Sequence, residues 1–264
     1  MPEAPSVLVL RGESTALALA EAQALGFQTH VRRGRLVLGV QTQALGAAAG
    51  TDAILEDGGL VPWTSNEALI ADVSGHVRAK QGRVCVRVER LGGRMGESST
   101  QAIARGLGGH LHDAGCTIDL DRPEHVLCVF LDATSQHVGW GWDVRRAERD
   151  DIGARRAGER PFFRPVSLDP HLARSAVNLA LGSRDGVVLD AMTGTGGFLI
   201  EGALMGHETV ALDLDPMMVD GASANLEWAL GGRAHRASVS LGDATALPAS
   251  LPATAVGRIS GLVL

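Results

Sequence analysis

A glycine-rich turn between a short apolar run and an apolar helix constrains the possible fold more than any other feature of this chain. Residues 187–189 (VVL) are β-branched or apolar, as expected for a buried parallel strand. The loop 190-DAMTGTGG-197 follows, and residues 198–205 then predict an apolar helix. The next predicted strand, residues 209–212, ends at Asp213. This order of strand, glycine turn, helix and strand predicts an open α/β sheet whose turn approaches a nucleotide-like ligand.

Three aspartates, Asp190, Asp213 and Asp243, stand at the carboxyl ends of three successive predicted strands. In an open α/β sheet these ends meet at the ligand crevice, so we expect three carboxylates around one pocket. A dinucleotide site requires G-x-G-x-x-G, but from Gly194 the chain reads G-T-G-G-F-L, which weakens a pyrophosphate interpretation. S-adenosylmethionine has no phosphate and offers ribose hydroxyls and an amino-acid tail, which carboxylates can bind. The alternative is that the aspartates only cap the helices that follow them.

A charged boundary precedes this stretch at residues 145–166. It lacks an apolar period, which favours a solvated linker; the alternative is a segment that contacts nucleic acid or packs over the cofactor pocket. Asp169 and Pro170 then begin a predicted helix over residues 171–181. Beyond the glycine turn, the patterns predict a helix at 217–230 and strands at 237–241 and 258–264.

The first 75 residues predict a small α/β unit. Strands are expected at residues 6–10, 27–31, 36–40 and 52–55, and helices at 14–25 and 42–49. Residues 57–63 (DGGLVPW) predict a connecting loop. Thr64 or Ser65 is expected to cap the helix after it.

Residues 76–146 predict a second, compact α+β module. Its expected elements are a strand at 84–89, a helix at 101–114 capped by Ser98 or Ser99, and strands at 117–120, 125–132 and 136–144. Trp140 and Trp142 share one face of the last strand, and core packing is favoured over base stacking for them.

Positive charge is concentrated in this second module, although the whole chain has a formal net charge of -6. Residues 76–110 contain seven basic and two acidic side chains. Because phosphate contacts need a basic surface, Arg83, Arg87, Arg90 and Arg94 are candidate RNA-binding residues. A solvated charged face is the alternative.

Metal and membrane functions are disfavoured by the sequence. The three cysteines lack CxxC spacing and are expected to be buried, and the nine histidines lack ligand spacing, so we expect no metal site. No apolar run approaches the ~20 residues of a membrane span. We therefore expect a cytoplasmic protein with no membrane partner.

Several longer motifs resemble a known family. The stretches DAMTGTGGFLIEGALMG, ALDLDPMMVDGASANLEWA and LGDATALP resemble motifs I to III of class I RNA N2-guanosine methyltransferases. RPFFRPVSLDPHLARSAVNLA resembles the region before motif I in the same group, and residues 83–146 are similar to a THUMP domain, an RNA-binding module of tRNA-modifying enzymes. In its order of segments the chain resembles the archaeal tRNA (guanosine-10-N2) methyltransferase family.

The resemblance implies the domain organisation and the ligands. It implies a ferredoxin-like α/β piece at 1–75, a THUMP-like domain at 76–146, a linker at 147–166 and a Rossmann-like class I methyltransferase domain at 167–264, incomplete at its C-terminus. S-adenosylmethionine is the implied cofactor and tRNA the implied partner. The family's cofactor-binding positions fall on Asp190, Thr193, Gly194, Thr195, Gly196 and Gly197, on Asp213 for the ribose, and on Asp243 with Ala244 for the adenine. The loop departs from the family at its start, where Asp190-Ala191-Met192-Thr193 replaces Asp-Pro-Phe/Met-Cys.

The family's catalytic motif, Asp/Asn-Pro-Pro-Tyr/Phe, does not occur in this sequence. The exocyclic amine of guanine is a poor nucleophile, because its lone pair is shared with the ring. A carboxylate or carbonyl must therefore accept the hydrogens of the amine and direct its lone pair at the sulfonium methyl. We expect this group just beyond Leu264, and hence a truncated chain that is inactive alone. The alternatives are a methyltransferase for another tRNA or rRNA guanosine, and a THUMP-type RNA-binding accessory protein with a degenerate, non-catalytic methyltransferase half.

Overall fold

The chain divides into two compact units in a computed structural model that describes residues 5–12, 14–41, 45–144, 152–165 and 167–264. Unit 1 comprises Met1–Thr15, Phe27–Gly46 and Thr51–Arg149. Unit 2 comprises Ala16–Gly26, Ala47–Gly50 and Asp150–Leu264. No helix among the described residues is long and apolar enough to cross a membrane.

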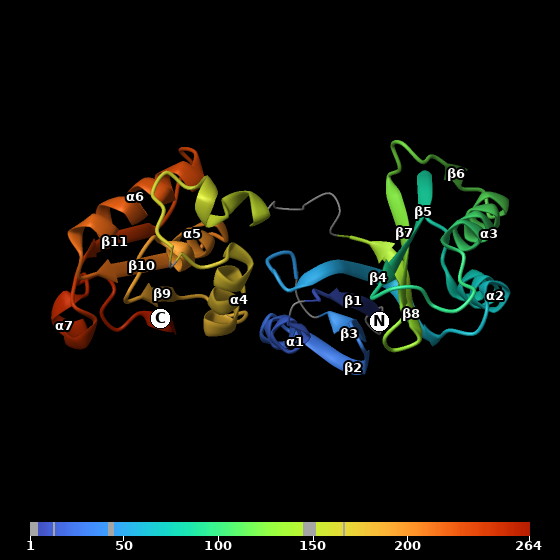
Figure 1. Ribbon diagram of the computed structural model, residues 1–264, viewed down its shortest axis with the longest axis horizontal. Coiled ribbons are helices and arrows are strands. Elements are labelled where there is room, and N and C mark those ends of the chain that lie inside the picture. Colours follow the sequence, from blue (N-terminus) through green and yellow to red (C-terminus); the bar gives the residue numbers. More distant parts are fainter. Residues whose placement is uncertain (1–4, 13, 42–44, 145–151, 166) are drawn as a thin grey trace. The chain divides into compact units, whose positions relative to one another are not determined.

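Unit 1 is built on a sheet with the strand order β2-β3-β1-β4-β8-β7-β5-β6. Its strands are β1 (Ser6–Leu10), β2 (Phe27–Arg33), β3 (Leu36–Gln41), β4 (Thr51–Pro62), β5 (Arg83–Leu91), β6 (Thr117–Ile118), β7 (His125–Asp132) and β8 (His137–Asp143). Helices α2 (Asn66–His76) and α3 (Thr100–Asp113) lie side by side on this unit (Figure 1). Their apolar faces, including Val73 and Leu107, share one core cluster with Trp140 and Trp142, which confirms the core prediction for the two tryptophans. Cys85, Cys116 and Cys128 are buried as expected.

Strand β4 is the main difference from the sequence-based prediction for this half. The loop predicted at 57–63 is wrong, because β4 continues to Pro62 and pairs with both β1 and β8. A register shift between Glu56 and Gly59 accommodates the polar stretch as a bulge, and Asp57 adopts a positive φ of 50° there. A Cβ at Gly58 would lie 2.0 Å from the carbonyl oxygen of Trp140, so the close strand approach requires glycine. The predicted helix at 42–49 is also wrong for residues 45–49, which are not helical, while residues 42–44 lie outside the described part.

Unit 2 is built on a parallel four-stranded sheet with the order β11-β10-β9-β12, which is covered by helices (Figure 1). Helices α4, α5 and α6 pack on one face, and residues 244–255 pack on the other. The strands are β9 (Val187–Asp190), β10 (Glu208–Asp213), β11 (Ala237–Leu241) and β12 (Ile259–Val263), and the helices are α4 (Pro170–Leu181), α5 (Gly197–Leu204), α6 (Pro216–Leu230) and α7 (Leu247–Ser250). Three 3-10 turns, η1 (Ile152–Arg155), η2 (Ala157–Glu159) and η3 (Ala244–Ala246), complete the unit as described. The predicted Rossmann-like fold is confirmed.

Helix α1 (Thr15–Ala24) contributes a buried carboxylate to unit 2. Glu21 is fully buried and accepts four hydrogen bonds. The donors are the backbone N–H groups of Ala49 (2.9 Å) and Gly50 (2.7 Å), Ser175 Oγ (2.9 Å) and Asn178 Nδ2 (2.7 Å). Because a buried carboxylate is stable only when its oxygens are satisfied, this network fixes α1 and residues 47–50 against α4.

Candidate functional site

The three aspartates predicted to share a pocket edge lie at the ends of neighbouring strands. Asp190 pairs with Ala211 in the β9–β10 register, and Asp213 pairs with Leu241 in the β10–β11 register. Asp243 follows two residues after Leu241. The parallel sheet therefore brings the three carboxylates to one edge, where open α/β sheets bind ligands.

The glycine-rich loop crosses this edge and is fastened to β10. The Thr193 N–H donates to the carbonyl oxygen of Leu212 at 2.9 Å, and the Gly194 N–H donates to Asp213 Oδ2 at 2.8 Å. Gly194 and Gly196 have φ values of 53° and 82°, in the left-handed region that side chains disfavour. Gly196 precedes the first turn of α5, whose backbone N–H groups lack partners within the helix. The loop thus presents backbone donors that a polar ligand can use.

Asp190 is the most unusual group of this loop. Its carboxylate is fully buried, and Oδ2 accepts a hydrogen bond from Thr193 Oγ1 at 2.8 Å. Oδ1 is also buried but has no hydrogen-bond partner within the described part of the chain. Burial raises the pKa of Asp190 to about 7. The hydrogen bonds from the Thr193 side chain and the Met192 backbone oppose this rise, and the nearby Asp213 carboxylate adds to it. A ligand with a positively charged donor at Oδ1 would satisfy this oxygen and favour the ionised form.

Asp213 combines anchoring of the loop with partial exposure. In addition to Gly194, it accepts a hydrogen bond from the Asp215 N–H at Oδ1, at 3.0 Å. A carboxylate has about four acceptor positions, so further donors such as ribose hydroxyls can still bind. Leu214 and Met217 beside it expose large apolar side chains, which is a surface suited to the flat face of a base.

Asp243 has the capping function that the sequence left open. Its Oδ1 accepts from the Thr245 N–H at 2.8 Å and from Thr245 Oγ1 at 2.7 Å, so it caps η3. The hydrogen bond from the Thr245 side chain, followed by the one from its backbone, lowers the pKa of Asp243 and keeps it ionised. Ala244 packs against the core cluster on the same side of the sheet. An ionised carboxylate thus remains at this edge together with the start of η3.

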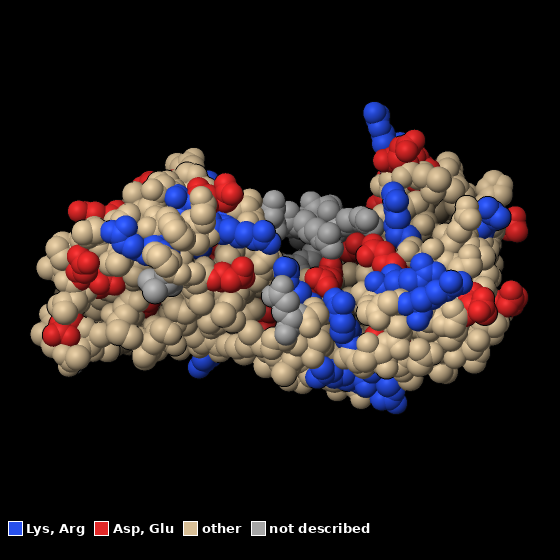
Figure 2. Space-filling view, in the orientation of Figure 1, with Lys and Arg blue, Asp and Glu red and all other residues tan. Residues whose placement is uncertain are grey.

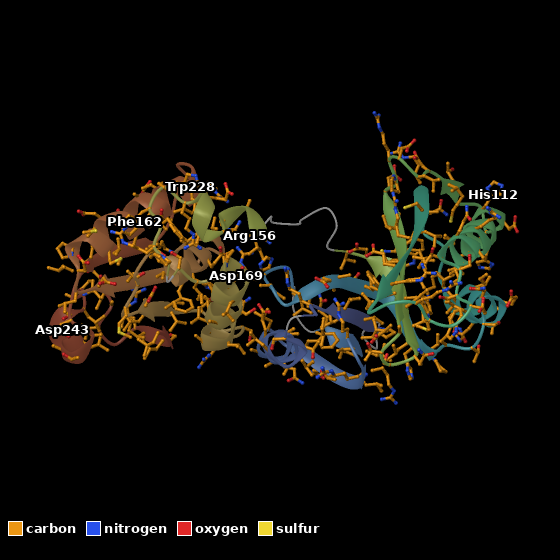
Figure 3. All side chains as sticks on the ribbon, viewed as in Figure 1. His112, Arg156, Phe162, Asp169, Trp228 and Asp243 are labelled. Carbon is orange, nitrogen blue, oxygen red and sulfur yellow. The ribbon has the colours of Figure 1, made fainter. Side chains whose placement is uncertain are left out.

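Residues 152–165, which the sequence favoured as a solvated linker, pack against unit 2. Asn225 of α6 accepts from the Phe162 N–H at 2.8 Å and donates to the Phe162 carbonyl oxygen at 2.8 Å. The Phe162 ring lies on Gly221, where a Cβ would fall 2.1 Å from the ring, and Figure 3 shows Phe162 over α6. Thr195 of the glycine loop donates from its hydroxyl to Ser167 Oγ at 3.0 Å, which ties the loop to residues near this segment. In the sequence, the aromatic pair Phe162-Phe163 within a charged stretch is the one feature that indicates this packing.

Buried arginines accompany this packing. Arg155 donates to Glu201 of α5 through Nε and Nη2 at 2.8 and 3.0 Å, and Arg174 of α4 donates to it at 2.8 Å. Glu201 is fully buried, so the two arginines compensate its charge and join the segment, α4 and α5. No local sequence pattern marks this cluster, because its members are far apart along the chain.

The four arginines predicted to bind RNA do not form one row. Arg83 and Arg87 lie on the same face of β5, because they are four residues apart in a strand, whereas Arg90 lies on the opposite face. Arg83 pairs with Glu124 at 3.0 Å, and Arg94 lies 4.0 Å from Glu97. All four are exposed. Figure 2 shows blue Lys and Arg groups on the body that holds β1–β8, with acidic groups between them.

Among the residues that the structure describes, no group of three or more His, Cys, Asp or Glu side chains could hold a metal ion. The arrangement at the sheet edge is instead one of backbone donors, carboxylates and exposed apolar side chains.

Comparison with protein-family models finds a match in the part of the chain that contains the sheet edge. Residues 157–260 match the RMKL-like methyltransferase domain family. The tRNA (guanine(10)-N2)-dimethyltransferase of Pyrococcus abyssi is 35% identical over 146 residues, which cover 55% of this chain and 42% of that protein. The enzyme of the same name from Methanothermobacter thermautotrophicus is 32% identical over 143 residues, covering 54% of this chain and 41% of that protein. The matched region thus spans less than half the length of either relative.

Comparison with solved structures concerns the fold. TrmN from Thermus thermophilus is similar with a TM-score of 0.52 and 21% identity, over 94% of this chain and 76% of that chain. A possible methylase from Clostridium difficile 630 is similar with a TM-score of 0.50 and 14% identity, over 92% of this chain and 76% of that chain. Residues 157–260 therefore match the RMKL-like methyltransferase domain family, and unit 2 has the mixed α/β fold of class I methyltransferases.

Proposed function

We propose that this protein binds S-adenosylmethionine and belongs to the machinery that methylates the exocyclic N2 of a guanosine in tRNA. The observation that carries the cofactor proposal is the fully buried Asp190 with its unpartnered Oδ1 beside a loop of left-handed glycines. The names of the relatives, both tRNA (guanine(10)-N2)-dimethyltransferases, support guanosine 10 as the acceptor. A tRNA substrate is also what makes a cytoplasmic location the expected one.

The proposed cofactor site is the sheet edge described above. Asp213 accepts from the ribose hydroxyls, and Asp243 with the Ala244 backbone contacts the adenine. Asp190 faces the ammonium group of the amino-acid tail, and the loop surrounds that tail; its members are Thr193, Gly194, Thr195, Gly196 and Gly197. When bound, the cofactor supplies a methyl group on a sulfonium centre. The chain's own residues hold the cofactor and exclude water from its tail, since Asp190, Thr193 and Thr195 are all buried.

The proposed RNA surface is the THUMP-like region, residues 76–146. Arg83, Arg87, Arg90 and Arg94 are exposed there and can reach phosphates. Arg87 also lines a cavity of about 540 Å³ with Lys80 and residues of β7 and β8. Arg87 and Arg90 lie on opposite faces of β5, so the double Arg87→Gln, Arg90→Gln variant removes a candidate phosphate contact from each face. Each contact that is lost should reduce the slope of log affinity against log salt for tRNA by roughly one. Arg32→Gln, a variant of an exposed arginine on β2, is the control, and an unchanged slope in the double variant would remove these residues from the RNA surface.

A binding experiment tests the cofactor site. We expect wild-type protein to bind S-adenosylhomocysteine in calorimetry and Asp213→Asn to bind it about 10 to 100 times more weakly, because a charge-assisted hydrogen bond contributes about 1.5–3 kcal/mol. Asp220→Asn, on the exposed side of α6, is the matched control. Equal affinities of wild type and Asp213→Asn would exclude the ribose assignment.

Deletion of the gene in its own host tests the acceptor. Mass spectrometry of the tRNA should show loss of N2-methylated guanosine at position 10, restored when the gene is returned. Loss at another tRNA guanosine or in rRNA would support the alternative acceptors. Unchanged N2-methylation together with intact RNA binding by the protein would support an accessory RNA-binding function.

A further inference from the structure

A buried arginine with unused donors lies against the start of α5. Arg160 is 5% exposed, and its Nε donates to the carbonyl oxygen of Arg155 at 2.9 Å. Its Nη1 and Nη2 are buried and have no hydrogen-bond partner within the described part of the chain. A guanidinium carries five N–H donors and stays charged in proteins, so two unpartnered nitrogens in the interior are costly. Such a group needs an acceptor that the described polypeptide does not supply, and a bound anion would provide one.

The buried carboxylate of Glu201, whose charge acts on Arg160, does not supply this anion. Glu201 accepts from Arg155 through both of its oxygens and from Arg174 through Oε2. Its charge lowers the cost of burying Arg160, but no hydrogen bond joins them in the described structure. Burial lowers the pKa of Arg160, the charges of Glu201 and Asp169 oppose this, and the positive charge of Arg155 adds to it. The pKa remains lowered on balance, so an added negative charge would be stabilising.

One of the unused nitrogens lies near the end of the glycine-rich loop. A Cβ built on Gly197, the first residue of α5, would lie 3.9 Å from Arg160 Nη1. Gly197 is also the end of the loop that begins at Asp190. The site therefore combines the positive end of the α5 dipole, free N–H groups of its first turn and a buried guanidinium. Each of the three favours a small anion.

We propose that Arg160 binds the carboxylate of the amino-acid end of S-adenosylmethionine. This inference rests on the function proposed above and adds the residue that fixes the cofactor's negative charge. A guanidinium fork matches a carboxylate with two parallel hydrogen bonds. The loop then has a buried positive group, Arg160, at its α5 end and a buried carboxyl group, Asp190, at its β9 end, which complements a zwitterion with one ammonium and one carboxylate. An RNA phosphate fits less well, because Arg160 is buried while RNA phosphates are hydrated and belong to a large polyanion.

Calorimetry on the whole protein tests this with two ligands, S-adenosylhomocysteine and its decarboxylated analogue. Wild-type protein should bind the first about 10 to 100 times more tightly than the second. Arg160→Gln should lose most of this preference and bind the decarboxylated analogue as wild type does, and Arg160→Lys should retain part of it. Arg156→Gln, an exposed neighbour labelled in Figure 3, should behave as wild type.

The outcomes separate the two proposals. If wild-type protein binds neither ligand, the cofactor proposal fails and this inference fails with it. If wild-type protein binds both ligands equally, the cofactor proposal stands and the assignment of Arg160 is wrong, a result that needs no variant and is independent of whether Arg160→Gln folds. An equal loss of affinity for both ligands in Arg160→Gln would also overturn the assignment of Arg160. That result would mean that the arginine has only a structural role, because it would not distinguish the ligand with a carboxylate from the one without.

Discussion

The titration of Asp190 gives a prediction whose size follows from the structure. Burial raises its pKa from 3.8 to about 7 in the folded protein, whereas in the unfolded chain it keeps an ordinary value. Between these two values the folded state holds a proton that the unfolded state has lost, so rising pH favours unfolding. At about 1.4 kcal/mol per pKa unit, the free energy of unfolding falls by roughly 4 kcal/mol over the full range, and by roughly 2.5 kcal/mol between pH 5 and pH 8. Above pH 8 the contribution is constant.

Asp190→Asn isolates this effect, because asparagine keeps an acceptor for Thr193 Oγ1 and cannot ionise. The stability of the variant relative to wild type should therefore increase by roughly 2.5 kcal/mol from pH 5 to pH 8. Urea denaturation followed by hydrogen-exchange mass spectrometry on peptides of β9 and α5 reads unit 2 separately from unit 1. Asp220→Asn, at an exposed site of the same unit, should show no such trend. Parallel pH profiles of Asp190→Asn and wild type would show that burial does not raise the pKa of Asp190 in the folded protein.

Three further substitutions test the packing around the site. Gly221→Ala places a methyl group 2.1 Å from the Phe162 ring and should destabilise unit 2 by about 1–3 kcal/mol in urea denaturation. The control Gly158→Ala, whose added Cβ has nothing within 4 Å, should change the stability by less than about 0.5 kcal/mol. Equal effects of the two substitutions would contradict the contact between Phe162 and Gly221. Gly196 and Gly206 both have left-handed φ values, 82° and 83°, so an alanine at either position should cost about 1 kcal/mol in strain. Only Gly196→Ala, whose Cβ would also lie 3.2 Å from Ala222, should weaken the binding of S-adenosylhomocysteine in calorimetry. Glu21→Gln replaces an acceptor oxygen by an NH2 group that faces the donors of the network, and should lower the stability of unit 2 by about 2–4 kcal/mol in urea denaturation. The control Glu227→Gln, at an exposed position, should cause a negligible change. A small effect of Glu21→Gln would show that the network can rearrange.

The sheet edge of unit 2 could be predicted from the sequence because its determinants are local. Each strand reads as an apolar run that ends in an aspartate, and the parallel arrangement then brings Asp190, Asp213 and Asp243 together without further information. The glycine loop is equally local, since the left-handed residues Gly194 and Gly196 are glycines that the sequence shows directly. That these residues bind a cofactor stays a prediction.

Features that depend on contacts between distant residues could not be read in this way. The continuation of β4 through Asp57 and Gly58 depends on pairing with β8, about 80 residues later, which outweighs the local preference of a DGG stretch for a turn. The packing of residues 152–165 depends on Asn225 and Gly221 of α6, and the burial of Arg155 depends on Glu201. From the sequence alone, an arginine in a charged stretch is predicted to be exposed to solvent, because its buried partner cannot be identified.

Two of the buried groups without a hydrogen-bond partner among the described residues, Asp190 Oδ1 and the Nη atoms of Arg160, lie at or near the two ends of the glycine-rich loop. Each disfavours the empty folded state, because its desolvation is not compensated by a hydrogen bond. A zwitterionic ligand that satisfies both at once stabilises the folded state by its binding free energy, which increases with ligand concentration above Kd. The same two groups reject ligands that lack either charge, since one of them would then stay buried and unpaired. If the proposed assignments of Asp190 and Arg160 hold, selectivity for the intact amino-acid tail follows from buried groups whose hydrogen bonds the polypeptide leaves incomplete.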